Sequence, residues 1–123
     1  MTKILLDTDV VINILKKKEE TLQQLNTLTD CELYITPIVI AEVYAGARPK
    51  EITQVETLFS YFESVIIEDE IGILTGNYAN EFQKAFNGIS LEDFIIAATA
   101  KHYNLTLWTY NKKHYPMRDI AFI

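Results

Sequence analysis

The chain has 123 residues, a length that leaves little room for more than one domain. We therefore expect residues 1–123 to form a single domain. The hydrophobic fraction of 49% and the charged fraction of 23% are typical of a globular protein and exclude a wholly disordered one. Since 17 acidic residues outnumber 11 basic ones, the net charge is −6, which disfavours a basic module that coats nucleic acid.

Cysteine usage and apolar runs predict where the protein resides. The single cysteine, Cys31, can form neither an intrachain disulfide nor a cysteine-built zinc site. The N-terminus has only three apolar residues before Asp7, and the longest apolar run, residues 94–98, is far shorter than a membrane span. We expect a soluble, cytoplasmic protein that does not enter a membrane.

Short β-rich runs alternate with helical patterns along the chain, which is typical of parallel βα units and predicts an α/β fold. The predicted strands are short and mostly apolar, as buried parallel strands are, and cover residues 3–6, 33–35, 64–67, 106–109 and 120–122. The predicted helices cover residues 10–18, 19–28, 37–45, most of 51–86, and 90–103. Thr36 and Pro37 mark the start of the third helix, and Asn87-Gly88 is expected to end the long helical region.

Four acidic residues stand near predicted strand ends, where open parallel sheets bind their ligands. Asp7 and Asp9 follow the first strand, Glu42 lies in the helix after the second, and Asp93 lies in the first turn of the helix before the fourth. Each aspartate also has a purely structural interpretation. Asp7 or Asp9 can cap the following helix, and Ser90 with Asp93 has the spacing of a capping box.

Glu42 has apolar neighbours nearly all round its helix, which predicts that it is buried. A buried carboxylate needs a partner, although a neutral or water-bonded glutamate at a helix edge is the alternative. If the four acids meet, a divalent cation relieves their repulsion, and all-oxygen ligation favours Mg²⁺ or Mn²⁺ over zinc. Because Mg²⁺ commonly takes further ligands from phosphate oxygens, the expected substrate is a phosphate ester.

Three segments carry a recognisable pattern: ILLDTDVVINIL at the start, TPIVIAEVYAGA around Glu42, and SLEDFIIAATAKHYNLTLWTYNKKHY near the end. With these segments, over nearly its whole length, the chain resembles the PIN-domain ribonucleases, especially the VapC-like toxins of bacterial and archaeal type II toxin–antitoxin pairs. The resemblance implies a three-layer α/β/α fold whose central five-stranded parallel sheet has the order 3-2-1-4-5. It also implies that Asp7, Glu42 and Asp93 hold Mg²⁺ or Mn²⁺ and that the protein hydrolyses RNA phosphodiesters, leaving 5′-phosphate ends.

One position departs from the family pattern. The family often has a fourth acid two residues after the Thr that ends the fourth strand, and here that residue is Asn111, after Thr109. A neutral amide gives no charge to a second metal ion, a role that Asp9 can partly take over. We expect Asp7 and Asp93 as the principal ligands, Glu42 as a ligand or a base, and Thr8, Thr109 and Asn111 as residues that position water or phosphate.

The resemblance further implies a homodimer bound by a small antitoxin that supplies cations to the acidic cleft. His102 and His114 have no partner at catalytic spacing and are expected to be surface or packing residues. Several basic residues are expected in solvated positions, with RNA backbone contact as the alternative: Lys16, Lys17, Lys18, Lys112, Lys113 and Arg118.

Three rival functions remain open at this point. The run from Asp7 to Val11 also resembles the first motif of haloacid-dehalogenase-type phosphatases, in which the first aspartate is a nucleophile. Asp93 is followed by Phe94, however, and lacks the second carboxylate of that family. A receiver-like signalling domain has a similar size and acidity but requires a lysine after the last strand. The third rival is a metal-free PIN scaffold that only binds a partner.

Overall fold

The computed structural model describes residues 1–85 and 88–123. They form a five-stranded parallel sheet in the order β3-β2-β1-β4-β5, which confirms the predicted α/β fold and strand order. The strands are β1 (Thr2–Leu6), β2 (Cys31–Ile35), β3 (Glu63–Ser64), β4 (Thr106–Trp108) and β5 (Ala121–Phe122). The α-helices are α1 (Thr8–Leu15), α2 (Glu19–Asn26), α3 (Pro37–Gly46), α4 (Ile52–Phe59), α5 (Asp69–Phe82) and α6 (Leu91–His102), and the 3₁₀ helices are η1 (Pro49–Glu51) and η2 (Lys112–His114).

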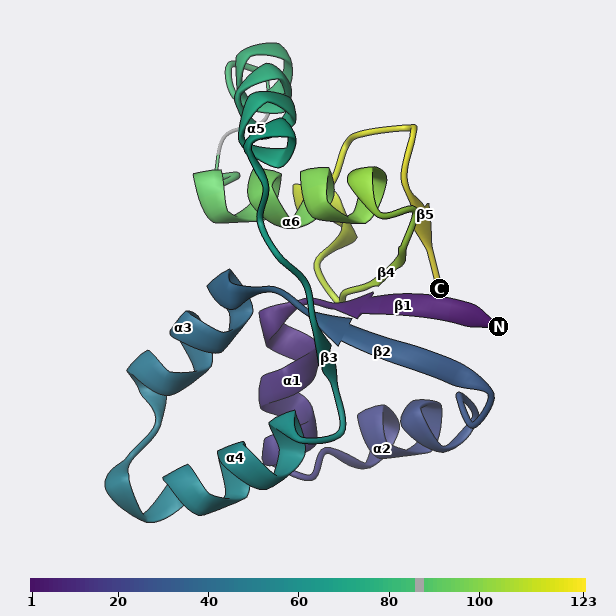
Figure 1. Cartoon of the computed structure of the whole chain (residues 1–123), viewed down its shortest axis with the longest axis vertical. Coiled ribbons are helices and arrows are strands. Elements are labelled where there is room, and N and C mark those ends of the chain that lie inside the picture. The colour runs from purple at the N-terminus through teal and green to yellow at the C-terminus, as the bar shows by residue number, and fades with distance from the viewer. Residues whose placement is uncertain (86–87) are drawn as a thin grey trace.

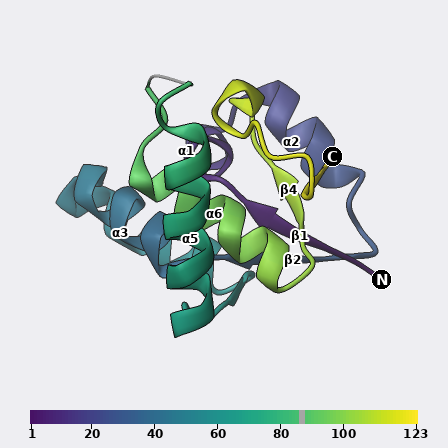
Figure 2. The ribbon, with the colours of Figure 1, turned by 90° about the horizontal axis from the view of Figure 1, so that it is seen from above.

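Helices cover both faces of the sheet (Figure 1). α1 and α2 lie on one face, with α4 beside α1, whereas α6 lies on the other face and α5 crosses over it (Figures 1 and 2). The first strand is therefore enclosed between two helical layers. No helix in the described part of the chain is long and apolar enough to cross a membrane.

The core is centred on β1. Residues 4–6 of this strand are fully buried, as are Val10 and Val11 of α1 and Phe94 and Ala97 of α6. Each fully buried aliphatic side chain of this size contributes roughly 1.5–3 kcal/mol to folding. Because both faces of β1 are packed in this way, the residues that directly follow the strand have a fixed position.

Side-chain caps set the starts of three helices. The Thr36 hydroxyl accepts a hydrogen bond from the Val39 N–H (3.1 Å) at the start of α3, and Ser90 forms the predicted capping box of α6. α1 begins at Thr8, two residues before the predicted start, because Asp7 Oδ1 accepts a bond from the Thr8 N–H (2.8 Å). The capping interpretation of Asp7 is thus correct.

Two predicted boundaries in the middle of the chain differ from the structure. β3 ends at Ser64 rather than at residue 67; the Val65 N–H still donates to Ile35 O (3.1 Å), after which the chain leaves the sheet towards α5. α5 ends at Phe82. The predicted helix stop at Asn87-Gly88 falls partly outside the described residues, since Asn87 is not described, whereas Gly88 has a φ of +90°.

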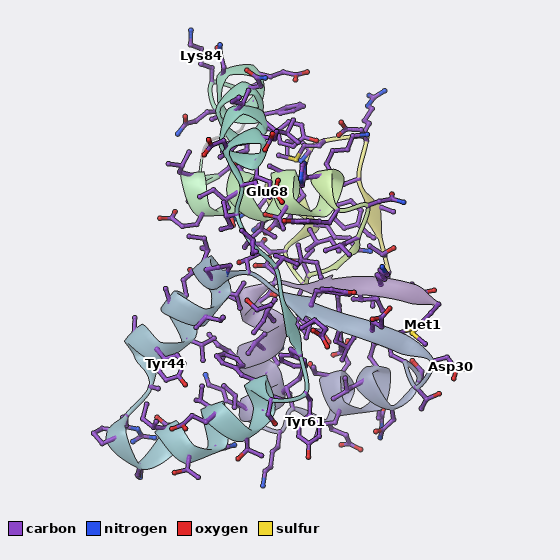
Figure 3. The ribbon with its side chains drawn as sticks, viewed as in Figure 1. Met1, Asp30, Tyr44, Tyr61, Glu68 and Lys84 are labelled. Carbon is purple, nitrogen blue, oxygen red and sulfur yellow. The ribbon has the colours of Figure 1, made fainter. Side chains whose placement is uncertain are left out.

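The prediction that α3 is buried on most faces is wrong for this chain. Val39 and Val43 are buried, but Glu42 is exposed. Tyr44, labelled in Figure 3, keeps 37% of its surface exposed. Its ring packs edge-on against Phe59 of α4, with centroids 5.9 Å apart. The described chain covers α3 on the side of α1 and α4 and leaves its outer side open. The buried-charge argument for Glu42 therefore does not hold.

Candidate active site

The candidate site lies where β1 and β4 run side by side, the point at which the strand order reverses and open α/β sheets bind ligands. In the register of this strand pair, Leu6 is opposite Trp108. The Asp7 N–H then donates to Trp108 O (3.0 Å), which extends the ladder by one bond. The parallel register thus brings Asp7 level with Thr109.

Asp7 is the most firmly held carboxylate of the site and is only 7% exposed. Besides the capping bond to its Oδ1, its Oδ2 accepts bonds from Thr109 Oγ1 (2.8 Å) and the Tyr115 hydroxyl (2.7 Å). Burial, then the charge of Asp7 and this hydrogen bond, raise the pKa of Tyr115 well above its ordinary value. The Tyr115 hydroxyl therefore stays protonated and donates to Asp7.

Asp9 has one satisfied and one unsatisfied oxygen. Its Oδ2 accepts a bond from the Tyr110 N–H (3.1 Å), whereas its buried Oδ1 has no hydrogen-bond partner among residues 1–85 and 88–123. Burial and, next, the negative charge of Asp7 raise the pKa of Asp9 to about 6, against the opposing effect of two backbone N–H groups; Asp93 adds a smaller upward contribution. Asp7, Asp9 and Asp93 thus lie within electrostatic reach of one another.

Asp93 combines the predicted structural role with a place in this cluster. Its N–H donates to Ser90 Oγ (3.2 Å), and its Oδ2 accepts from the Ser90 N–H (3.1 Å), so the capping box is present. The same Oδ2 lies 3.0 Å from Nδ1 of His114. The start of α6 therefore presents its carboxylate to the segment that follows β4.

The prediction that His114 lacks a partner at catalytic spacing is wrong. Its Nδ1 lies 3.0 Å from Asp93 Oδ2 and 2.9 Å from Nδ2 of Asn111. A single ring nitrogen either donates its proton to Asp93 or accepts one from an amide. Both contacts form together only if the Asn111 amide presents its oxygen, in which case the two oxygens share the one Nδ1 proton. The turn of η2 places His114 next to Asn111, because the His114 N–H donates to Asn111 O (2.9 Å).

Glu42 lies on the exposed side of the site. Thr8 Oγ1 donates to Glu42 Oε1 (2.9 Å), which joins α3 to the start of α1. Glu42 lines a groove of about 230 Å³ between α1, α3 and α4, together with Glu51. Arg48 follows Glu42 by six positions, and its Nε pairs with Glu51 (3.2 Å).

The structure brings Asp7, Asp9 and Asp93 together and leaves Glu42 at the edge. The hydroxyls of Thr8 and Thr109, expected to position water or phosphate, donate to carboxylates, and Thr109 Oγ1 also accepts from the Asn111 N–H (3.0 Å). Sequence reasoning missed Tyr115 and the role of His114; the one available signal was that both belong to the NKKHY end of the third family-like segment.

The donors of this site suit a divalent cation, although they do not yet surround one point. No group of three or more His, Cys, Asp or Glu side chains in the described ranges is already arranged to hold a metal ion. The donor atoms are carboxylate oxygens, one of them buried without a partner in the described part of the chain, and the carboxylates repel one another. A hard cation such as Mg²⁺ prefers oxygen ligands, would give the remaining oxygen a partner and would neutralise the repulsion. The side chains must move towards it to bind.

Comparison with known proteins places the chain in a family. A model of the PIN domain matches residues 4–122, so the chain belongs to the PIN-domain family. It is 35% identical to Ribonuclease VapC1 of Methanocaldococcus jannaschii over 115 residues, which cover 93% of this chain and 79% of that protein. It is 29% identical to Ribonuclease VapC19 of Mycobacterium tuberculosis over 115 residues, 92% of each protein.

A solved structure agrees with this assignment. DNA-bound VapBC from Salmonella typhimurium includes a chain that matches with a TM-score of 0.85 and 25% identity, covering 100% of this chain and 98% of that one. The resemblance to PIN-domain ribonucleases is therefore confirmed. The match of the PIN model to residues 4–122 favours this family over the haloacid-dehalogenase and receiver-like alternatives.

Proposed function

We propose that the chain is a divalent-metal-dependent endoribonuclease and the toxin of a type II toxin–antitoxin pair. The match to the PIN model, the relatives named Ribonuclease VapC and the structural likeness to a VapBC complex support this function. The observation that carries it is the gathering of Asp7, Asp9 and Asp93 at the reversal point of the sheet. PIN-domain VapC ribonucleases depend in general on a divalent metal, and we propose Mg²⁺ or Mn²⁺ because every donor here is an oxygen.

Asp7 and Asp93 act as the principal metal ligands in this proposal. A bound divalent cation supplies Lewis-acid activation of the phosphodiester and of the attacking water. Thr109 and Tyr115 hold Asp7 from one side and the Thr8 N–H holds it from the other, so this carboxylate needs little rearrangement to bind. A site that is organised in advance loses less free energy on binding.

His114 and Asn111 position Asp93. When Nδ1–H of His114 donates to Asp93 Oδ2, the second carboxylate oxygen is left for the cation. Asn111 contributes no charge, and Asp9 supplies the additional carboxylate that the family often has after the fourth strand. Its Oδ1, which has no hydrogen-bond partner among the described residues, is the atom we assign to this role.

Glu42 approaches from the exposed side, as a further ligand or as the base that accepts a proton from water. Thr8 restrains it through one hydrogen bond while leaving its other oxygen available. We further propose that residues 1–123 form one PIN domain, that the protein acts on RNA in the cytoplasm, and that it forms a homodimer bound by a small antitoxin. The likeness to VapBC and the uncovered outer side of α3 support these partners.

An RNA cleavage assay tests the function. Purified wild-type protein with Mg²⁺ is expected to cut RNA and leave 5′-phosphate ends, and a chelator is expected to stop the reaction. Asp93→Asn should be inactive, whereas Asp30→Asn, an exposed aspartate before β2 and away from the site, should retain activity (Figure 3). Equal cleavage by wild type and Asp93→Asn would overturn the assignment.

A metal titration separates the enzyme from the remaining rival, a PIN scaffold that binds a partner without metal. Mn²⁺ binding is measured in the wild-type protein and in Asp7→Asn. The enzyme requires saturable binding that the substitution weakens. A scaffold requires no binding in either protein.

A further inference from the structure

A second pocket lies beside Asp7 and Asp9 and includes Thr109, which holds Asp7, in its lining. It has a volume of about 350 Å³ and lies between α2 and the segment after β4. Its lining includes Glu20 and Gln24 of α2 and Trp108, Tyr110 and Lys112 of the β4–η2 segment. We call it the α2 pocket.

Tyr110 forms a rigid aromatic surface in the α2 pocket. It is 43% exposed, yet its hydroxyl forms a hydrogen bond with Oγ1 of Thr21 (2.9 Å), a residue that is only 1% exposed. Its backbone N–H donates to Asp9, and the Trp108 ring packs edge-on against its ring with centroids 6.4 Å apart. The exposed ring is therefore fixed before any ligand arrives, which lowers the entropic cost of stacking on it.

The charged and amide side chains of the pocket come from two elements, α2 and η2. Lys112 is exposed, and its ammonium lies 5.6 Å from the ring centroid of Phe122, within cation–π distance. Glu20 and Gln24 are exposed residues four positions apart on one face of α2. A phosphate is attracted by Lys112 and repelled by Glu20, whereas the amino and amide edge of a base suits Glu20 and Gln24.

We propose that the α2 pocket binds one base of a single-stranded RNA substrate close to the cleaved phosphate. The base stacks on Tyr110, its edge faces Glu20 and Gln24, and Lys112 contacts an adjacent phosphate. Because the Glu20 carboxylate accepts hydrogen bonds, the pocket favours bases with an exocyclic amino group over uracil. The bond between Tyr110 and Asp9 places this pocket directly beside the proposed metal ligands. The inference rests on the proposed ribonuclease function and adds a specificity-determining site to it.

The binding test uses single-stranded RNA oligonucleotides that differ at one base near the cut site. Their affinity is measured by fluorescence anisotropy with Mg²⁺ in an Asp93→Asn background, which prevents cleavage. Tyr110→Leu should raise Kd about 5- to 160-fold, the range expected for one lost base stack. Tyr110→Phe keeps the ring and should recover most of that affinity. Tyr61→Leu, an exposed tyrosine outside the pocket, serves as the matched control.

A second variant tests the proposed contact between Lys112 and a phosphate and leaves Tyr110 unchanged. Lys112→Gln should reduce the slope of log Kd against log salt by about 0.7. Lys84→Gln, near the far end of α5, should leave the slope unchanged (Figure 3). An unchanged slope in Lys112→Gln would remove the phosphate contact from the proposal.

The cleavage profile distinguishes failure of this inference from failure of the function. If wild-type protein cuts RNA but Tyr110→Leu shows the same Kd and the same base preference, the pocket is not a base site, while the ribonuclease function stands. Absence of RNA binding by both the wild-type chain and its Asp93→Asn variant would overturn the function and the pocket together. The proposal predicts a preference for bases with an exocyclic amino group over uracil. A preference for uracil that persists in Glu20→Gln would contradict the proposed contact between Glu20 and the edge of the base.

Discussion

The two sides of the candidate site differ in how firmly the structure holds their carboxylates. On the sheet side, Asp7 is 7% exposed and accepts hydrogen bonds from Thr8, Thr109 and Tyr115. On the helix side, Glu42 is exposed and accepts a bond from Thr8. The sheet side is thus organised before a cation binds, whereas Glu42 must lose side-chain entropy when it joins the site.

This difference follows from the elements that carry the residues. Asp7 continues a strand whose two neighbours and two helical layers fix its backbone, while Glu42 lies on a helix that the described chain covers on one side only. The comparison predicts that sheet-side substitutions affect both stability and activity, and that helix-side substitutions act on metal affinity. Four changes test it.

The largest effect is expected from Asp7→Asn. Loss of a principal ligand should lower RNA cleavage by more than about 100-fold, the upper end of the cost of removing a residue that merely supports a ligand. Initial cleavage rates at saturating Mg²⁺ provide the measurement. A loss below tenfold contradicts the assignment of Asp7 as a principal ligand.

Tyr115→Phe removes one donor to Asp7 and leaves the ring in place. We expect the free energy of unfolding to fall by about 2 kcal/mol, as for a hydrogen bond to a charged group, and activity to fall roughly 10- to 100-fold. Urea denaturation and cleavage rates measure the two effects. Tyr78→Phe is the matched control, because its hydroxyl donates to Asp119 (2.8 Å) outside the site. It should lose stability and keep activity; equal activity losses in both variants would point to a general structural effect.

Glu42→Gln should lower cleavage by about tenfold at low Mg²⁺ and leave stability within about 0.5 kcal/mol of wild type, since the side chain is exposed. Because Glu42 is exposed and joins the site only when the metal binds, its loss should mainly weaken metal affinity. Higher Mg²⁺ should therefore restore most of the cleavage rate. The metal concentration dependence of cleavage is the measurement, with Glu51→Gln in the same groove as control. A loss that no metal concentration restores would place Glu42 in a proton-transfer role instead.

The smallest effect is a change in pH dependence. The pKa of Asp9 is about 6 in the folded protein against an ordinary 3.8, so the folded state favours the protonated form. This contribution to stability is fully present below about pH 4 and is lost as pH rises through 6. In chelator, Asp9→Asn should therefore gain about 1 kcal/mol over wild type between pH 4 and pH 7, after allowance for its partial exposure. Urea denaturation at both pH values tests this, and parallel stability curves would contradict it.

The sheet side of the site was largely predictable because local signals fix it. The apolar run before Asp7 forms a buried strand, and the capping pattern around Ser90 and Asp93 forms the start of α6. Strand ends in a parallel sheet share one edge, so the approach of Asp7 and Asp93 follows from the strand order. That these residues bind a metal remains a prediction.

The remaining contacts depend on geometry that residue spacing does not contain. Tyr115 reaches Asp7 across 108 positions, and His114 reaches Asp93 across 21, both through the short turn of η2. The apolar pattern of α3 was interpreted as burial, yet such a pattern does not tell whether this chain or another molecule covers the face. For this reason the exposure of Glu42 was mispredicted.

The most direct test of the central claim is the affinity for Mn²⁺, measured by electron paramagnetic resonance in the absence of RNA. Wild type, Asp7→Asn and Glu42→Gln are compared under the same buffer and pH. If the sheet-side carboxylates form the organised part of the metal site, Asp7→Asn weakens binding by more than about 100-fold and Glu42→Gln by about tenfold. Equal losses in the two variants, or a larger loss in Glu42→Gln, would contradict this account.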